Sequence, residues 1–287
     1  MGHFTTGDGT RLYYKDWGSG TPVVFTHSWS LSSEMWNYQM AHLADRGLRC
    51  IAYDRRGHGR SEQPWGGYDF DTLSDDLAAL MEHLDLTEVT LVGHSTGTGE
   101  VARYLTRHGS ARVAKVVLVS TLTPLLRQAP DYPEGVPGSV FDEMRARIGT
   151  DLPGWVDEIA GPFFGAGTPG VTVSQSLVDW SVWDTRAVCV PAMLGLSRTM
   201  SETDFREELT RVTVPTLVVH GGADAFNPVD LCGRGTAKLV PGSVLKVYED
   251  GPHGLHLTHM DQLNADLWEF ITGDAPGPGI AAEPSEA

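Results

Sequence analysis

Three side chains in this sequence could together activate a hydroxyl group, and they occur in the order serine, aspartate, histidine. Ser95 is the central residue of the segment GHSTG at positions 93–97, and Asp224 and His253 follow much later in the chain. A serine hydroxyl is a weak nucleophile at neutral pH, so it needs a base and an acid that orients this base. Ser95, Asp224 and His253 are therefore predicted to form a catalytic triad.

The segment GHSTG matches a G-x-S-x-G turn between a strand and a helix. An apolar run at 89–92 precedes it, and a helical pattern begins at Glu100. In such a turn the serine is forced towards positive φ, and the residues two before and two after it must be small. The amide of Thr96 would point from a helix N-terminus towards an oxygen beside Ser95. The motif alone is weak evidence, because a glycine-rich chain also forms such turns around a surface serine.

The positions of Asp224 and His253 strengthen this interpretation. Asp224 follows a strand-like run at 214–220, and His253 follows another at 244–248. In a parallel sheet, the loops after the strands carry the reactive residues. Asp224 could instead have the common role of a turn aspartate, which leaves Asp230 and Glu249 as alternative acids.

The histidines near His253 offer a second interpretation. His253, His256 and His259 are spaced three residues apart, as in some metal clusters. No glutamate stands where a zinc motif such as H-E-x-x-H requires one, so neither a metal nor a cofactor is expected. His256 and His259 remain alternative bases, and His256 is also expected to line the entrance of a substrate pocket.

Two further loops after strands contribute to the predicted site. The loop at 27–30 follows a strand at 22–26, and the amide of Trp29 is the expected second donor to a developing oxyanion. The charged loop at 54–61 follows a strand at 49–53. It could bind phosphate, but the favoured interpretation is a support beneath the turn at Ser95. The residues expected to contact substrate are Ser28, Ser30, Trp155, Phe163, Phe164, Trp180, Trp183, Met193 and His256.

Strand-like and helical runs alternate along most of the chain, which predicts an α/β fold with a mostly parallel sheet and helices on both faces. Residues 121–210 break this pattern, because they contain short helical runs and no strand-like run. They are predicted to form a helical cap within a single domain at 1–272. Ser139 and Ser201 are each followed three residues later by an aspartate, which predicts that they cap two of these helices. Residues 273–287 have the composition of a disordered tail.

Composition excludes several classes of partner. The chain of 287 residues has 21 Lys and Arg against 37 Asp and Glu, a net charge of −16. Such a surface repels nucleic acid and anionic membranes. Three cysteines without a C-x-x-C spacing, no evident signal peptide and no long apolar run favour a cytoplasmic protein. Formation of a homo-oligomer is compatible with the sequence.

The chain resembles the α/β-hydrolase superfamily and, within it, the cofactor-free haloperoxidases and related perhydrolases and arylesterases. The segments that carry the resemblance are 22–32, 53–61, 93–104, 201–206 and 251–259. The resemblance implies an eight-stranded sheet with a helical cap, the triad at Ser95, Asp224 and His253, and oxyanion donors at Trp29 and Thr96. It implies hydrolysis of small esters through an acyl-enzyme. With peroxide as acceptor, that family makes peracids, which then oxidise halides.

One loop departs from the family pattern. The family usually has His-Gly-x-Pro there, whereas this chain has Ser28 in place of the glycine and Ser30 in place of the proline. Backbone strain is expected at Ser28 if the glycine has positive φ. In that family the proline is associated with peroxide use. Because this chain lacks it, hydrolysis of esters or lactones is expected to be the main activity. The alternative is a non-hydrolytic role, as a lyase, a cyclase or a small-molecule receptor.

Overall fold

The computed structural model describes residues 1–274, which form one eight-stranded sheet in the order β1-β2-β4-β3-β5-β6-β7-β8. Only β1 and β2 run antiparallel to their neighbours, and the other pairs are parallel. The α/β prediction is therefore confirmed. The strands are β1 (Gly2–Thr5), β2 (Arg11–Gly18), β3 (Pro22–Thr26), β4 (Arg49–Tyr53), β5 (Val89–His94), β6 (Val113–Val119), β7 (Thr216–Gly221) and β8 (Val244–Tyr248).

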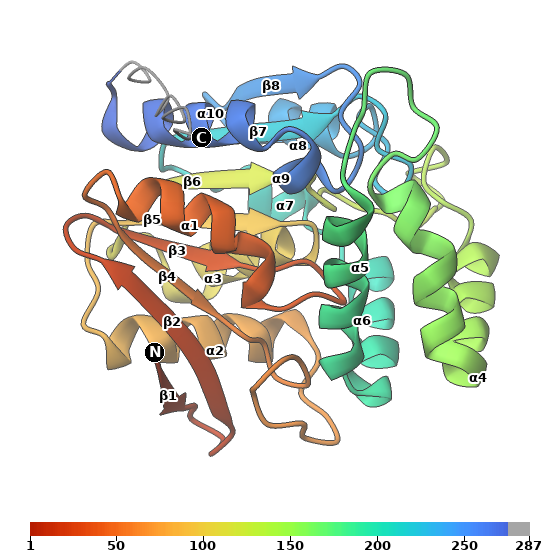
Figure 1. The fold of residues 1–287 in the computed structure, drawn as a ribbon, viewed down its shortest axis with the longest axis horizontal. Coiled ribbons are helices and arrows are strands. Elements are labelled where there is room, and N and C mark those ends of the chain that lie inside the picture. Colours follow the sequence, from red (N-terminus) through yellow and green to blue (C-terminus); the bar gives the residue numbers. More distant parts are fainter. Residues whose placement is uncertain (275–287) are drawn as a thin grey trace, which may run out of the picture.

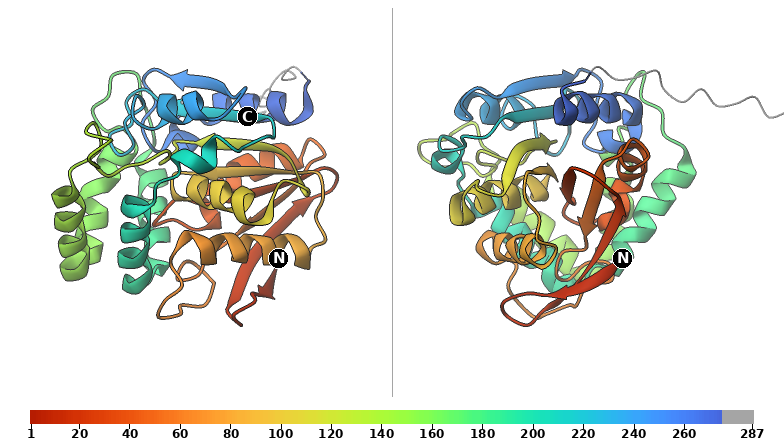
Figure 2. Two further views of the ribbon diagram at one scale, coloured as in Figure 1. Left: turned by 180° about the vertical axis from the view of Figure 1, so that it is seen from behind. Right: turned by 90° about the vertical axis from the view of Figure 1, so that its left-hand side faces the viewer.

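Helices cover both faces of the sheet because side chains of each strand alternate between them. Along β5, Leu91 packs on the side of α2 (Phe70–His83) and α3 (Thr96–His108). The next residue, Val92, packs on the side of α1 (Asn37–Ala44) and α10 (Met260–Thr272). Figure 2 shows α2 and α3 on the face that is turned away from the viewer in Figure 1. The remaining elements of this part are η1 (Ser33–Trp36), α8 (Gly233–Leu239) and α9 (Leu255–Thr258).

The predicted helical segment lies between β6 and β7, and its longer helices stand beyond the carboxyl ends of the strands (Figure 1). We call this segment the cap. Its only strand-like pairings within the described residues are isolated bridges. The cap elements are α4 (Gly138–Phe163), α5 (Gln175–Asp184), η2 (Thr185–Ala187), α6 (Val190–Glu202) and α7 (Arg206–Leu209).

Two predicted helix caps are wrong. Ser139 lies inside α4, which begins after Pro137. Proline restricts its own backbone to a conformation that can precede a helix, so the helix starts earlier than the serine pattern suggests. Ser201 lies in the last turn of α6, where its Oγ donates to the carbonyl oxygen of Ser197 at 2.9 Å. A serine hydroxyl can bond back to the preceding turn as well as cap the next helix.

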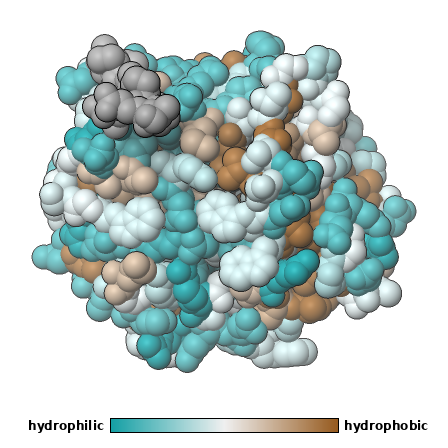
Figure 3. Space-filling model, in the orientation of Figure 1, coloured by the Kyte–Doolittle hydropathy of each residue, from teal (hydrophilic) through white to brown (hydrophobic). Residues whose placement is uncertain are grey.

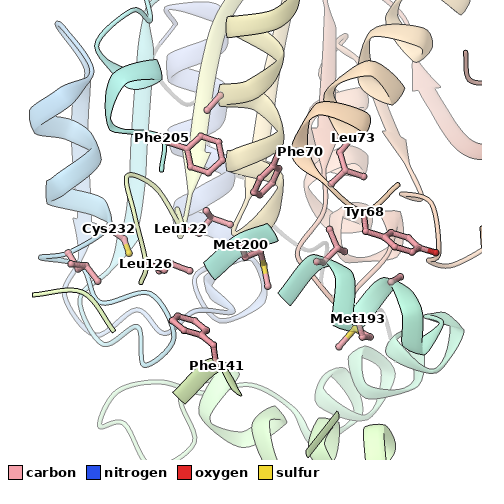
Figure 4. Close-up of a cluster of buried hydrophobic side chains, with 14 of the residues drawn as sticks. Tyr68, Phe70, Leu73, Leu122, Leu126, Phe141, Met193, Met200, Phe205 and Cys232 are labelled. Carbon is pink, nitrogen blue, oxygen red and sulfur yellow. The ribbon is translucent and has the colours of Figure 1, made fainter. Parts of the chain in front are cut away.

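A large hydrophobic cluster joins the cap to the sheet-covering helices (Figure 4). Met193 and Met200 of α6 belong to it, together with Phe70 of α2 and Phe205 beside α7. The rings of Phe70 and Phe205 meet edge to face with their centroids 5.1 Å apart. The cap is therefore anchored by apolar packing on α2 and α3.

The last helix of the described residues is α10, and Gly273, which caps its C-terminus, has a left-handed φ of 81°. Glycine is favoured there because it has no Cβ. Apart from Gly273 and Asp274, the tail predicted at 273–287 lies outside the described residues. Within residues 1–274, no helix combines the length and apolar character needed to cross a membrane.

Candidate active site

Ser95 stands at the junction between β5 and α3 in a strained backbone conformation. Its φ is 52° and its ψ is −114°. Its amide donates to the carbonyl oxygen of Val119 at 3.0 Å, and its own carbonyl accepts from the amide of Thr98 at 2.9 Å. These bonds to the neighbouring strand and helix hold the turn. A side chain kept at positive φ in this way points a hydroxyl out from the carboxyl edge of the sheet.

The glycines on either side of Ser95 are needed for close contacts. A Cβ on Gly97 would lie 2.3 Å from Oγ1 of Thr26, and a Cβ on Gly93 would lie 2.7 Å from the carbonyl oxygen of Gly97. Oγ1 of Thr26 also donates to that same Gly97 carbonyl at 3.0 Å. The predicted need for small residues at both positions is therefore confirmed.

We expect Gly97→Ala to destabilise the protein by about 1–3 kcal/mol, because the added methyl group overpacks the contact between α3 and β3. The measurement is the free energy of unfolding from urea denaturation. Gly149→Ala is the matched control, since a Cβ at this exposed position in α4 meets no atom within 4 Å. The control should raise stability by up to about 1 kcal/mol. Equal stability changes in the two variants would contradict the prediction.

Asp224 and His253 meet in the loops after β7 and β8. Nδ1 of His253 lies 2.7 Å from Oδ2 of Asp224, and both residues are buried. Oδ1 of Asp224 accepts from the amides of Phe226 and Asn227, each at 2.9 Å. Burial raises the pKa of Asp224, but His253, His220 and the Asn227 amide together lower it more, so the net pKa lies below the ordinary value. An ionised Asp224 fixes the His253 proton on Nδ1 and leaves Nε2 free to accept another.

The other candidate acids lie away from this pair. Asp230 has a side chain that is 88% exposed and forms an ion pair with Arg234. Glu249 is exposed in the turn after β8. Neither carboxylate contacts His253 within the described hydrogen bonds and ion pairs.

The backbone of His253 is held by two residues that the sequence did not single out. Its carbonyl oxygen accepts from Nε2 of His94 at 2.9 Å and from Oγ of Ser120 at 3.0 Å. Ser120 itself has a φ of 45°, and its carbonyl accepts from Nδ2 of Asn227 at 3.0 Å. The signal that could have found Ser120 is its place directly after β6, the rule that already located Ser95.

The loop at 27–30 follows β3, which pairs in parallel with β5, so Trp29 and Thr96 lie at the same edge of the sheet. Two of its carbonyl groups are held by histidine rings. Nδ1 of His27, in the loop itself, lies 2.7 Å from the Ser28 oxygen, and Nε2 of His58, in the loop at 54–61, lies 2.5 Å from the Trp29 oxygen. Among residues 1–274, the non-glycine residues with positive φ are Asp85, Glu88, Ser95 and Ser120. Ser28 is not one of them, so the strain expected there is absent, and a serine fits this position without cost to the backbone.

The loop at 54–61 supports this edge. Arg55 is buried and forms an ion pair with Glu100 of α3, with Nη2 of Arg55 2.8 Å from Oε2 of Glu100. The same Nη2 donates to the His27 carbonyl at 2.8 Å. Arg56 is equally buried and binds Asp76. Arg55 therefore ties the Trp29 loop to α3. Because the guanidinium groups of Arg55 and Arg56 are both enclosed and paired, the alternative of phosphate binding is not supported.

A cavity of about 110 Å³ lies between this edge and the cap. Ser95 and His253 both line it, as do Ser28, Trp29 and Ser30. Two cap residues that were predicted to contact substrate, Trp155 and Phe163, also line this cavity. The lining residues that the sequence did not identify are Leu122, Leu126, Phe141, Met144, Ile159, Met200, Phe226 and Asn227. Four of these, Leu122, Leu126, Phe141 and Met200, are labelled in Figure 4.

Five residues predicted to contact substrate do not line this cavity. Trp183 is 61% exposed, Trp180 packs edge to face on Tyr38, and Met193 is fully buried in the cluster of Figure 4. Phe164 lies behind Phe163 and lines neighbouring cavities instead. Met193 and Phe164 pack within the cap, because a helix presents most of its apolar face to its neighbours, whereas Trp183 does not.

His256 is the fifth of these residues, and it lies inside the protein. Its ring packs near those of Trp36, His94 and Phe164, and neither ring nitrogen has a partner among the described residues. Burial and the neighbouring His253 lower its pKa to about 3, so the ring is neutral. The expectation that His256 lines the pocket entrance is wrong.

The histidine spacing after β8 does not produce a metal cluster. Nε2 of His259 lies 3.2 Å from Oδ1 of Asp250 in a partly exposed pair, away from the buried His256. Between residues 1 and 274, no three His, Cys, Asp or Glu side chains converge as metal ligands would.

Comparison with known proteins identifies the family of this chain. Residues 21–167 match the family model described as alpha/beta hydrolase fold. The chain is 45% identical over 274 residues to a non-heme chloroperoxidase of Streptomyces lividans, which covers 94% of this chain and 99% of the relative. It is 40% identical over 282 residues to a bifunctional esterase/perhydrolase of Acinetobacter calcoaceticus, with 94% and 99% covered. The crystal structure of a bromoperoxidase from Bacillus anthracis superposes with a TM-score of 0.91 at 38% identity, again covering 94% and 99%. The chain therefore belongs to the alpha/beta hydrolase family and, within it, to the group of non-heme haloperoxidases.

Proposed function

We propose that this hydrolase cleaves small carboxylic esters through an acyl-enzyme on Ser95. The observation that carries the proposal is the cavity that Ser95 shares with His253, whose Nδ1 lies 2.7 Å from Asp224. A strained serine is also retained at a φ of 52°. Such strain persists only where the surrounding structure enforces it, and it is typical of nucleophiles. A receptor or binding protein has no need of it.

In the proposed acylation, His253 acts first as a base and then as an acid. Nε2 of His253 takes the Ser95 proton as Oγ attacks the acyl carbon, and Nδ1–H of His253 donates to Asp224 throughout. The amides of Trp29 and Thr96 donate to the oxygen that becomes negative. His253 then gives the proton to the leaving alcohol oxygen, and the acyl group stays on Ser95.

Deacylation repeats these steps with a new acceptor. His253 takes a proton from water, the oxygen attacks the acyl carbon, and a carboxylic acid leaves while Ser95 regains its proton. Hydrogen peroxide in place of water yields a peracid by the same proton transfers. The bifunctional esterase/perhydrolase relative supports this second acceptor. Ser30, which replaces a proline of the family pattern, makes water the main acceptor in our proposal.

A fluorophosphonate probe tests the nucleophile directly. We expect one covalent adduct on the peptide that contains Ser95, detected by mass spectrometry of the intact protein and of its digest. Labelling should disappear after Ser95→Ala and after denaturation, because the oxyanion donors and the base are needed for reaction. An unlabelled native protein would instead favour a lyase, a cyclase or a binding protein on this scaffold.

A further inference from the structure

Two more cavities continue outward from the candidate catalytic cavity. The first, of about 30 Å³, lies between the loop after β3, the end of α4 and α5. The second, of about 490 Å³, lies between the end of α4, the segment that follows it and α5. Ligand sites commonly occupy about 300–1,000 Å³. The catalytic cavity of about 110 Å³ is small on this scale, whereas the outer cavity is within it.

The three cavities share lining residues, so they adjoin one another. Ser30, Ile159 and Phe163 line both the catalytic and the middle cavity. Ala160, Phe164 and Val182 line both the middle and the outer cavity. The middle cavity is therefore a narrow waist between the other two. Figure 3 shows a hydrophobic surface band in the region between α4 and α5.

The waist adjoins two sides of the catalytic cavity, because Ser30 belongs to the Trp29 loop and Phe163 lies beside His253. The ring of Phe163 is 5.1 Å from that of His253, centroid to centroid, and Phe163 forms part of the waist. Other lining residues lie on the oxyanion side, where Oγ1 of Thr96 donates to Sδ of Met200 at 2.7 Å. In the proposed reaction His253 protonates the leaving oxygen, so the alcohol chain begins beside Phe163.

We propose that the waist and the outer cavity form a channel for the alcohol portion of an ester with an extended, uncharged apolar chain. This inference rests on the proposed function, since it assigns one half of the substrate. The acyl portion is small and occupies the rest of the catalytic cavity. Asp157 and Asp179 line the outer cavity, so a chain that ends in a carboxylate is repelled.

Alkyl acetates from methyl to octyl, and methyl alkanoates with acyl chains of the same lengths, test the channel. For the wild-type protein, kcat/KM should rise about threefold for each methylene of the alcohol that enters the channel. It should not rise along the acyl series. Ala160→Phe narrows the waist from α4 and Val182→Phe narrows it from α5. Both variants should lose the rise, which is judged within each variant by comparing its kcat/KM values along the alcohol series. Ala146→Phe, an exposed position on the same helix α4, is the matched control and should keep the rise.

Two results of the ester series would contradict the channel. An unchanged rise in both waist variants would mean that the chain lies elsewhere, and a rise only in the acyl series would place the acyl chain there. Binding of octanol to the Ser95→Ala protein, measured by calorimetry, needs no turnover. We expect it to weaken at least tenfold after Ala160→Phe and to persist after Ala146→Phe. A wild-type protein that does not hydrolyse methyl acetate would contradict the proposed function, whereas octanol binding would still report on the channel.

Discussion

Replacing Ser95 by alanine is expected to lower kcat for short esters by about 10⁵- to 10⁶-fold. The hydroxyl is the atom that forms the acyl-enzyme, and no other side chain can replace it at that place in the turn. The fold should be unchanged, because the bonds that hold the turn come from the backbone of residue 95. The measurement is steady-state hydrolysis of a phenyl acetate, with circular dichroism and thermal unfolding to compare the folded states.

Ser30→Ala is the matched control for this experiment, since Ser30 lines the same cavity but has no role in the proposed proton transfers. It should retain most of the wild-type kcat. If the alanine variant at position 95 turned over esters at the wild-type rate, the acyl-enzyme mechanism would be wrong. If both variants lost activity equally, the loss would report damage to the cavity and not loss of a nucleophile.

The second large effect is expected for Asp224→Asn, which should lower kcat by about 10⁴-fold. Oδ1 would still accept from the amides of Phe226 and Asn227, so the new amide NH₂ must face Nδ1 of His253. That nitrogen would then have to accept a hydrogen bond, which moves the proton of the neutral ring to Nε2. His253 could no longer take the Ser95 proton. The measurement is kcat for the same ester across the pH range in which wild type is active.

Asp230→Asn removes a carboxylate of the same type six residues away, from an exposed ion pair with Arg234. This control should change kcat by less than the error of most assays, because exposed ion pairs contribute little. Full activity in Asp224→Asn would contradict the orienting role. Glu249 would then be the next candidate for the acid that orients His253.

The backbone architecture could be predicted because each element left a local pattern. The turn at 93–97 combines a strand, two glycines and a helix, and the sheet rule then places loops after strands on a common edge. Asp224 and His253 could be located by that rule without knowing how the strands pair. The same rule applied to β6 would have located Ser120, whose hydroxyl and carbonyl both contact the loops of this edge.

The wall of the catalytic cavity could not be predicted in the same way. Its residues come from separate helices and loops, and no single periodicity relates Leu122 to Met144 or Phe226. An aromatic side chain in a helical cap can pack inward, outward or sideways, and only the packing of helices against one another decides this. Trp155 and Trp183 illustrate the inward and the outward direction, since Trp155 lines the cavity and Trp183 is exposed.

The position of the cap in the chain has a consequence for how such enzymes diversify. The proposed nucleophile, acid and base all lie on loops of the sheet, whereas most of the cavity wall is encoded by one uninterrupted stretch between β6 and β7. The cap is thus one block of sequence between the segment that carries Ser95 and the segment that carries Asp224 and His253. Substitutions inside this block change the cavity wall and leave the three proposed catalytic residues in place, provided that Ser120 before it is kept, because its hydroxyl holds the His253 carbonyl.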